Sequence, residues 1–215
     1  VNAQSSLETS RQELNNYMNK LIINKKDVAG RLLDGAVFTL EKKVNDTYEV
    51  ITDNLVLTQG ELVLKGYDAG YYRLTETQAP EGYILNTEVI DFEIKLNAND
   101  QAIDETVDVI NYQGSVPLTK VDENQKLFEG VYYDLYDGND KLVHKDLVTD
   151  VNGEIALLNS LQPGTYYFKE TKSVEGNLVN ETPITFDIPE SFSGEPVEVS
   201  RSASNAKAAI EFKKT

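Results

Sequence analysis

The sequence predicts an all-β protein that consists of two tandem β-sandwich domains. Short runs rich in Val, Ile, Tyr, Phe and Thr recur along the chain, separated by turn residues such as those of 137–140. Short strands at regular spacing are typical of antiparallel sandwiches and barrels. One sequence unit also occurs twice, with a period of about 95 residues. The length of 215 residues allows two domains, since about 100 residues suffice for one.

The two copies of the repeat share a skeleton of lysine, glycine, glutamate and asparagine. In both copies the glycine follows the lysine by 10 residues (35 − 25 and 130 − 120), and the asparagine follows the glutamate by 35 residues (111 − 76 and 205 − 170). Two homologous domains explain this agreement far better than coincidence. The shared positions are Lys25, Gly35, Glu76 and Asn111 in the first copy, and Lys120, Gly130, Glu170 and Asn205 in the second.

The repeat predicts three segments along the chain. Residues 20–113 form the first expected domain and residues 114–215 the second, with a boundary at a short junction where Gly114 breaks the strand pattern. Residues 1–19 form a lead segment. Apolar residues recur at roughly helical spacing between Leu7 and Leu21, which indicates a short leading helix or a plain tether.

Strand alternation places the repeated polar residues on apolar faces. Side chains two residues apart share a face of a strand. The closing row of the second copy is the exception, because Arg201 interrupts it and requires a bulge or an early strand end. The rows are Leu21, Ile23, Lys25; Tyr72, Leu74, Glu76; Val107, Val109, Asn111; Val116, Leu118, Lys120; Tyr166, Phe168, Glu170; and Val197, Val199, Arg201, Ala203, Asn205.

A lysine, a glutamate and an asparagine that point into a core compensate one another's burial. Each is costly to bury alone, by several kcal/mol for an ion. The pattern by itself leaves two interpretations equally open. One is a structural Lys–Glu ion pair with a hydrogen-bonded asparagine, and the other is a reactive set.

Charge and composition exclude several classes of function. The net charge of −16 and the pI near 4.4 argue against nucleic acid or anionic lipid as a partner, since both require clustered cations. The chain has no cysteine and one histidine, so no metal site or cofactor is expected. No apolar run approaches the roughly 20 residues that span a bilayer, and no membrane association is expected.

The motifs around these residues resemble the collagen-adhesin B-type domain family of Gram-positive pilins and adhesin stalks. The resemblance covers about residues 20–215. Its most specific element is the Glu-Thr box of residues 74–83, which has a weaker copy at 169–172. The other elements are the first-strand Lys-x-Asp motif, at Lys25 and Asp27 and again at Lys120 and Asp122, and the turn of residues 149–153.

The resemblance implies a transthyretin-like, inverse-immunoglobulin β-sandwich with an intramolecular amide bond between the first-strand lysine and the last-strand asparagine. Carried over, the isopeptide pairs are Lys25 with Asn111 and Lys120 with Asn205, and Glu76 and Glu170 take the catalytic position. Burial favours the neutral forms of lysine and glutamate. The free amine then attacks the asparagine carbonyl, and the glutamate helps ammonia leave. The reaction occurs once per domain and is not enzymatic turnover.

The family further implies an extracellular, cell wall-anchored protein, joined to other pilin subunits by sortase and able to contact a host cell surface or extracellular matrix. No proline precedes a lysine, and no Leu-Pro-x-Thr-Gly sorting motif occurs. An ancillary or basal pilin therefore fits better than a shaft pilin. The alternative is a glycan-binding accessory β-sandwich module of a cell-wall enzyme, for which the 12 tyrosines would supply exposed aromatic rings.

Overall fold

The computed structural model describes residues 18–207, and their regular structure consists of β-strands alone. The predicted all-β class is therefore confirmed. No helix in this range is long and apolar enough to cross a membrane. Most of the expected leading helix lies outside the described residues, and its last two residues, Lys20 and Leu21, begin the first strand.

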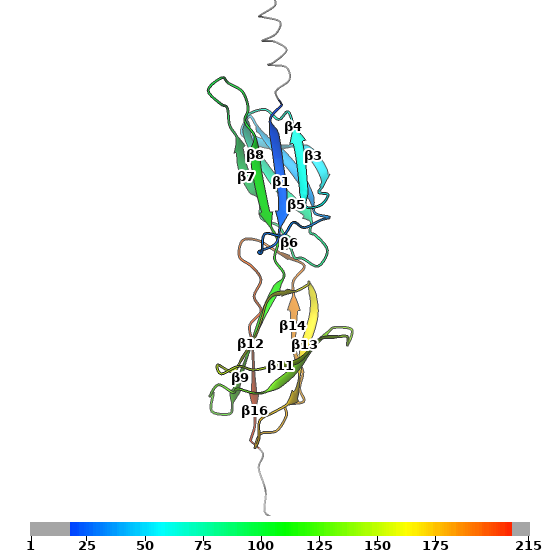
Figure 1. Ribbon diagram of the computed structural model, residues 1–215, viewed down its shortest axis with the longest axis vertical. Helices are drawn as coiled ribbons and strands as arrows, with labels where there is room; N and C mark the ends of the chain where they lie inside the picture. Colours follow the sequence, from blue (N-terminus) through cyan, green and yellow to red (C-terminus); the bar gives the residue numbers. More distant parts are fainter. Residues whose placement is uncertain (1–17, 208–215) are drawn as a thin grey trace, which may run out of the picture. The chain divides into compact units, whose positions relative to one another are not determined.

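The first unit is a sandwich of two sheets (Figure 1). A three-stranded sheet has the order β4-β1-β8 and a four-stranded sheet has the order β3-β2-β5-β7. The core cluster draws Leu21 from one sheet and Phe38 from the other, so the sheets pack face to face. The strands are β1 (Lys20–Lys26), β2 (Val37–Val44), β3 (Thr47–Val56), β4 (Glu61–Lys65), β5 (Gly70–Gln78), β6 (Leu85–Asn86), β7 (Ile90–Ile94) and β8 (Glu105–Ile110).

The second unit repeats this architecture strand for strand in its two main sheets. The three-stranded sheet has the order β12-β9-β16 and the four-stranded sheet the order β11-β10-β13-β14. The predicted pair of homologous sandwiches is confirmed. The strands are β9 (Gly114–Asp122), β10 (Tyr132–Asp137), β11 (Leu142–Val148), β12 (Glu154–Leu161), β13 (Gly164–Lys172), β14 (Ile184–Ile188), β15 (Ser191–Phe192) and β16 (Arg201–Asn205).

Contacts divide the described chain into two compact units. The first contains the described residues up to Glu81 together with Leu85–Asn111, and the second contains Gly82–Ile84 and the described residues from Tyr112 on. The repeat did not anticipate the assignment of Gly82–Ile84. The domain bounds that it suggests, 20–113 and 114–215, stay a prediction.

In each unit the first and last strands lie side by side and run parallel. β1 pairs with β8 so that Lys25 lies opposite Val109, and β9 pairs with β16 so that Lys120 lies opposite Ala203. Parallel neighbours require a long crossover, and here the rest of the unit forms it. The residues that open and close each unit are thereby brought together.

A tight turn positions the end of the first strand in each unit. The backbone N–H of Lys25 donates to Gly60 O at 2.8 Å, and that of Lys120 donates to Gly153 O at 2.7 Å. Gly60 has a φ of +77°, and a Cβ there would lie 2.7 Å from Leu32 Cβ. Both the left-handed backbone and the lack of space require glycine at this position.

Substitution Gly60→Ala is expected to lower the free energy of unfolding of the first unit by about 3 kcal/mol, from a left-handed alanine together with a steric clash. Gly35→Ala is the matched control, because Gly35 has a φ of +84° but open space around its Cα. Its expected cost is about 1 kcal/mol. Hydrogen exchange of first-unit peptides measures both values. Equal costs would show that the clash is relieved.

Candidate functional site

Each unit buries its first-strand lysine completely. Lys25 on β1 and Lys120 on β9 both have 0% of their surface exposed. Their backbones are held on both sides, since Lys25 O also accepts from Leu33 N at 2.8 Å and Lys120 O from Phe128 N at 3.0 Å. The lysine side chain of each unit therefore projects into the core from a fixed backbone, as the strand alternation predicted.

A glutamate from the opposite sheet faces each lysine. Glu76 on β5 and Glu170 on β13 are 4% and 3% exposed. Lys25 Nζ lies 3.0 Å from Glu76 Oε1, and Lys120 Nζ lies 2.9 Å from Glu170 Oε2. The two sheets of each sandwich are thus joined by a buried ion pair.

The closing asparagine completes the cluster from the strand beside the lysine. Asn111 directly follows β8 and donates its backbone N–H to Lys26 O at 3.0 Å. Its Nδ2 donates to Glu76 Oε2 at 3.1 Å. The backbone N–H of Asn86 donates to the same oxygen at 2.9 Å. All three predicted residues of the first unit therefore meet in one buried cluster.

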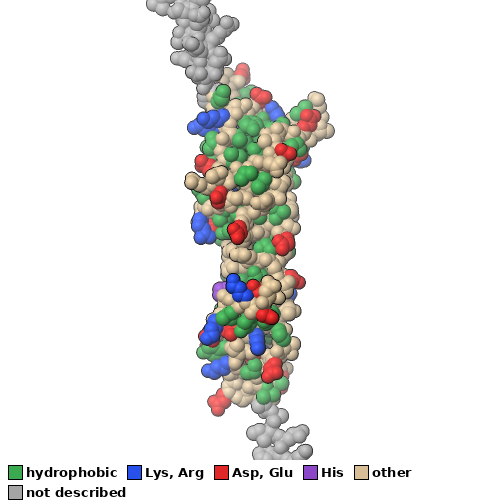
Figure 2. Space-filling model, turned by 90° about the vertical axis from the view of Figure 1, so that its right-hand side faces the viewer, with side chains coloured by type: hydrophobic (Ala, Val, Ile, Leu, Met, Phe, Trp, Pro, Cys, Tyr) green, Lys and Arg blue, Asp and Glu red, His purple; other side chains and the backbone are tan. Residues whose placement is uncertain are grey.

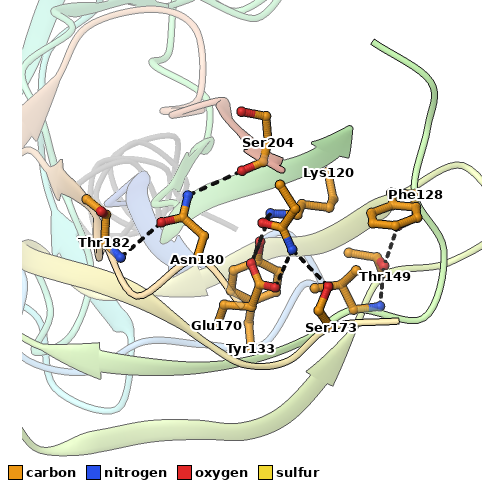
Figure 3. Close-up of polar contacts among 11 residues, drawn as sticks. Lys120, Phe128, Tyr133, Thr149, Glu170, Ser173, Asn180, Thr182 and Ser204 are labelled. Carbon is orange, nitrogen blue, oxygen red and sulfur yellow. Dashed lines mark hydrogen bonds and ion pairs between the residues drawn. The ribbon is translucent and has the colours of Figure 1, made fainter. Parts of the chain in front are cut away.

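In the second unit Lys120, Tyr133, Glu170 and Ser173 lie together (Figure 3), and the carboxamide of Asn205 contacts both the lysine and the glutamate. Lys120 Nζ donates to Asn205 Oδ1 at 2.5 Å, and Asn205 Nδ2 donates to Glu170 Oε1 at 2.5 Å. The amine therefore lies against the amide carbonyl, while the carboxylate holds the amide nitrogen. An amine beside a carbonyl, with a proton carrier at the leaving nitrogen, is the arrangement that amide exchange requires.

Burial shifts both lysines toward the neutral amine. Desolvation lowers the pKa of Lys25 from 10.5 to about 8, although the charge of Glu76 and its hydrogen bond act in the opposite direction. Desolvation likewise lowers the pKa of Lys120, against the hydrogen bond and charge of Glu170. A lysine becomes a nucleophile only as the free amine, so the shift favours reaction.

An aromatic ring covers each lysine, which sequence reasoning did not assign to the site. Lys25 Nζ lies 5.6 Å from the ring centroid of Phe38, and Lys120 Nζ lies 5.6 Å from that of Tyr133. The register pairs Phe38 with Glu76 and Tyr133 with Glu170. The matching place of these aromatics after the shared glycine was the available signal.

Two hydroxyl groups of the second cluster were also missed. Tyr133 Oη donates to Glu170 Oε2 at 3.2 Å. Ser173 Oγ accepts from Asn205 Nδ2 at 2.9 Å. Desolvation, followed by the charge of Glu170, raises the pKa of Tyr133, so its hydroxyl keeps the proton that it donates. No motif marks Ser173 in the sequence.

Arg201 does not enter the core of the second unit. β16 begins at Arg201, and its side chain is half-buried, with the guanidinium 5.9 Å from the ring centroid of Phe186. Arg201 Nε donates to Thr185 O at 3.2 Å. The interruption in the apolar row therefore marks the start of the strand, and Ala203 and Asn205 continue inward.

The turn of residues 149–153 uses the carboxylate of Asp150 for its own backbone. Asp150 Oδ1 accepts from Asn152 N at 2.9 Å and from Glu154 N at 2.8 Å. Between residues 18 and 207, no three acidic, histidine or cysteine side chains are grouped as metal ligands. The turn is explained by local hydrogen bonding.

The outer surface of the described chain shows weaker candidates for a functional site than the buried clusters do. On the face drawn in Figure 2, acidic and basic side chains are scattered rather than gathered in one patch. Tyr71, at 56% exposure, is the one aromatic among the largely exposed apolar residues of the described chain. Glycan-binding modules use several exposed rings, so the buried clusters are the stronger candidate for function.

Comparison with protein families gives one match, repeated along the chain. The model for the SpaA prealbumin-like fold domain matches residues 19–110 and again residues 114–205. The two matches fall on the two sandwiches and include Lys25, Glu76 and all three residues of the second cluster. No curated protein sequence matches the chain.

Three solved structures with a similar fold are the Bacillus anthracis TIE protein, a fragment of a pilus adhesin and a minor pilin. The Bacillus anthracis TIE protein is 25% identical with a TM-score of 0.50, over 88% of this chain and 34% of that one. A C-terminal fragment of the pilus adhesin SpaC from Lactobacillus rhamnosus GG is 16% identical, with a TM-score of 0.46. The match covers 92% of this chain and 100% of that one. GBS52, the minor pilin of Streptococcus agalactiae, is 18% identical, with a TM-score of 0.43 over 92% and 99%. The chain thus spans about a third of the TIE protein.

Without a crosslink, the first unit should become more stable as the pH rises from 8 to 10.5. Asn111→Ala removes the asparagine that the family resemblance pairs with Lys25, so the variant carries no such bond. Lys25 has a pKa of about 8 in the folded unit, against an ordinary lysine pKa of 10.5, so the unfolded chain binds more protons between these values. The free energy of unfolding should rise by about 3 kcal/mol across this window and be lost again as the pH falls.

Urea unfolding followed by circular dichroism between pH 7.5 and 11 measures this dependence. Lys25→Met combined with Asn111→Ala is the control, because it keeps every other titrating lysine and tyrosine. The control should lack the rise that is due to Lys25. Identical slopes for the two proteins would show that the pKa of Lys25 is not lowered by folding.

Proposed function

Because this chain belongs to the family of SpaA prealbumin-like fold domains over both of its units, we propose that it is a structural and adhesive protein of a Gram-positive surface. The proposed role is that of a minor pilin or adhesin stalk, stabilised by Lys25–Asn111 and Lys120–Asn205 isopeptide bonds. The observation that carries the proposal is the buried lysine, glutamate and asparagine cluster, which occurs once in each unit.

The proposed setting follows from the family resemblance of the sequence. The protein would be extracellular and attached to the cell wall, with sortase joining it to other pilin subunits. A host cell surface or extracellular matrix is the proposed adhesive target. The chain spans about a third of the TIE protein, so these assignments are proposals.

The proposed reaction begins with proton transfer from the lysine ammonium to the glutamate that faces it. The free amine then forms a bond from Nζ to Cγ of the asparagine. The glutamic acid donates its proton to Nδ2 and takes one from Nζ. The Cγ–Nδ2 bond breaks, ammonia leaves, and the glutamate remains protonated beside a neutral amide. All protons are accounted for, and no oxidant or cofactor is required.

Folding supplies most of the catalysis in this scheme. The lysine lies on one of two adjacent parallel strands, the asparagine ends or directly follows the other, and the glutamate reaches them from the opposite sheet. Fixed geometry of this kind raises the effective concentration of the reactants by many orders of magnitude. The reaction consumes its own groups, so the protein is not an enzyme with turnover.

The topology explains why such bonds suit a stalk. Tension enters the first unit through β1 and leaves through β8, which are parallel neighbours. A Lys25–Asn111 bond passes the force from one strand directly to the other. The residues from 26 to 110 then carry no load, and the sandwich does not have to resist unfolding by its hydrogen bonds alone.

The intact mass of the wild-type protein should be about 34 Da below the mass of its sequence, because each bond releases one ammonia of about 17 Da. Glu76→Ala and Glu170→Ala should each retain one ammonia and stay folded by circular dichroism. Glu88→Ala, at an exposed carboxylate, is the matched control and should lose both. A wild-type mass equal to that of the unmodified sequence would show that neither bond forms. Loss of both ammonia molecules in Glu76→Ala would show that Glu76 is not needed for the reaction.

Single-molecule pulling from the two chain ends tests the mechanical role. A crosslinked first unit should show no unfolding step at forces that extend ordinary sandwich domains. Glu76→Ala should release roughly 300 Å of chain in one step, since about 85 residues extend by about 3.5 Å each. Glu88→Ala should behave as the wild type. A 300 Å step in crosslinked wild-type protein would contradict the proposed load path.

A further inference from the structure

The two clusters are equivalent in backbone but not in chemistry. Phe38 and Tyr133 occupy the same register position opposite the glutamate. Ala79 and Ser173 each lie three residues after the glutamate, at the first position past β5 and β13. At both places the second unit carries a hydroxyl where the first unit has an apolar side chain.

Both hydroxyls contact groups of the proposed reaction. Tyr133 Oη donates to Glu170 Oε2 at 3.2 Å, the same oxygen that lies 2.9 Å from Lys120 Nζ. Ser173 Oγ lies 2.9 Å from Asn205 Nδ2. The amide nitrogen of Asn205 thus has two acceptors, Ser173 Oγ and Glu170 Oε1.

We propose that Ser173 is a further catalytic residue of the second unit, whose hydroxyl holds the nitrogen that leaves Asn205 as ammonia. The inference rests on the proposed function, because it assigns a role within the same bond-forming reaction. It concerns Nδ2 of Asn205, whose bond to Cγ breaks as it leaves as ammonia.

The chemical argument follows the state of that nitrogen. When Lys120 Nζ bonds to Cγ, the amide resonance of Asn205 is lost and Nδ2 acquires a lone pair that must be protonated before the Cγ–Nδ2 bond breaks. One N–H held by Ser173 Oγ stops the nitrogen from rotating. The lone pair then stays directed at the Glu170 carboxyl, which donates the proton.

Tyr133 complements this arrangement on the other carboxyl oxygen. Its hydroxyl keeps its proton, because desolvation and the charge of Glu170 raise its pKa. It therefore holds Oε2 toward the lysine and leaves Oε1 directed at Asn205. In the first unit the backbone N–H of Asn86 donates to the corresponding carboxylate at 2.9 Å.

The test compares the two bonds within one molecule. Full-length chain purified unreacted in denaturant is diluted into folding buffer, quenched at intervals and digested. Mass spectrometry then follows the crosslinked Lys120–Asn205 and Lys25–Asn111 peptides. Ser173→Ala should slow the Lys120–Asn205 bond about fivefold to tenfold, the effect of one neutral hydrogen bond, and leave the Lys25–Asn111 bond unchanged.

Three further variants separate a chemical role from a structural one. Ser173→Thr keeps a hydroxyl and should restore the wild-type rate. Ser202→Ala, at an exposed serine of β16, should have no effect. Folding is not expected to limit Ser173→Ala, because the first unit already carries alanine at the matching position. Tyr133→Phe should slow the second bond less than Ser173→Ala does, since it acts only through Glu170.

The outcomes distinguish this inference from the proposed function. A wild-type rate in Ser173→Ala, or an equally slow rate in Ser173→Thr, overturns the role of the hydroxyl while both bonds still form. Equal slowing of both bonds would show a general folding effect and would also overturn it. If the wild type forms no Lys120–Asn205 bond, the proposed function of the second unit fails instead.

Discussion

The burial of one lysine against one glutamate across the two sheets is the constraint on which each sandwich depends. Lys25 and Lys120 are fully enclosed, and an unpaired ammonium in that place would be costly by several kcal/mol. The glutamate must therefore come from the opposite sheet at the same height. This requirement fixes the register of the two sheets relative to each other, and the apolar rows on either side pack around it.

The chain topology turns this ion pair into a three-residue cluster. Because the first and last strands are parallel neighbours, the asparagine that closes each unit lies two residues beyond the register partner of the lysine that opens it. The glycine turn that follows β3, at Gly60, and its counterpart at Gly153 hold the lysine backbone in place. No part of the cluster is local in sequence, so the cluster exists only when the whole sandwich has formed.

The two-sandwich fold and the core position of the cluster residues could be predicted from sequence, because both leave a regular pattern in the repeat and in the strand alternation. Alternation assigns a face to each residue, and it correctly placed Lys25, Glu76 and Asn111 in the core. It does not tell which atoms meet, so the contact of Ser173 with Asn205 and that of Tyr133 with Glu170 were not foreseen. Alternation also failed to place the start of β16, because the cation–π and backbone contacts of half-buried Arg201 are made with β14 of the other sheet. The assignment of residues 82–84 to the second unit could not be predicted, because it leaves no trace in the repeat pattern.

The proposed bond would remove the desolvation cost of the buried ion pair from each core. Before reaction, each core contains an ion pair whose desolvation is only partly offset by mutual attraction. After reaction, the lysine nitrogen belongs to a neutral amide and the glutamate is neutral as well, so the cost of burying two charges disappears. Ammonia leaves to solvent, which opposes the reverse reaction. Closing a loop of 86 residues (111 − 25) adds roughly 4 to 5 kcal/mol in the chain-entropy account of crosslinks. On this reasoning the non-covalent sandwich is the less stable precursor. The free energy released when its two buried charges are neutralised favours the formation of the amide bond, which is irreversible once ammonia has left.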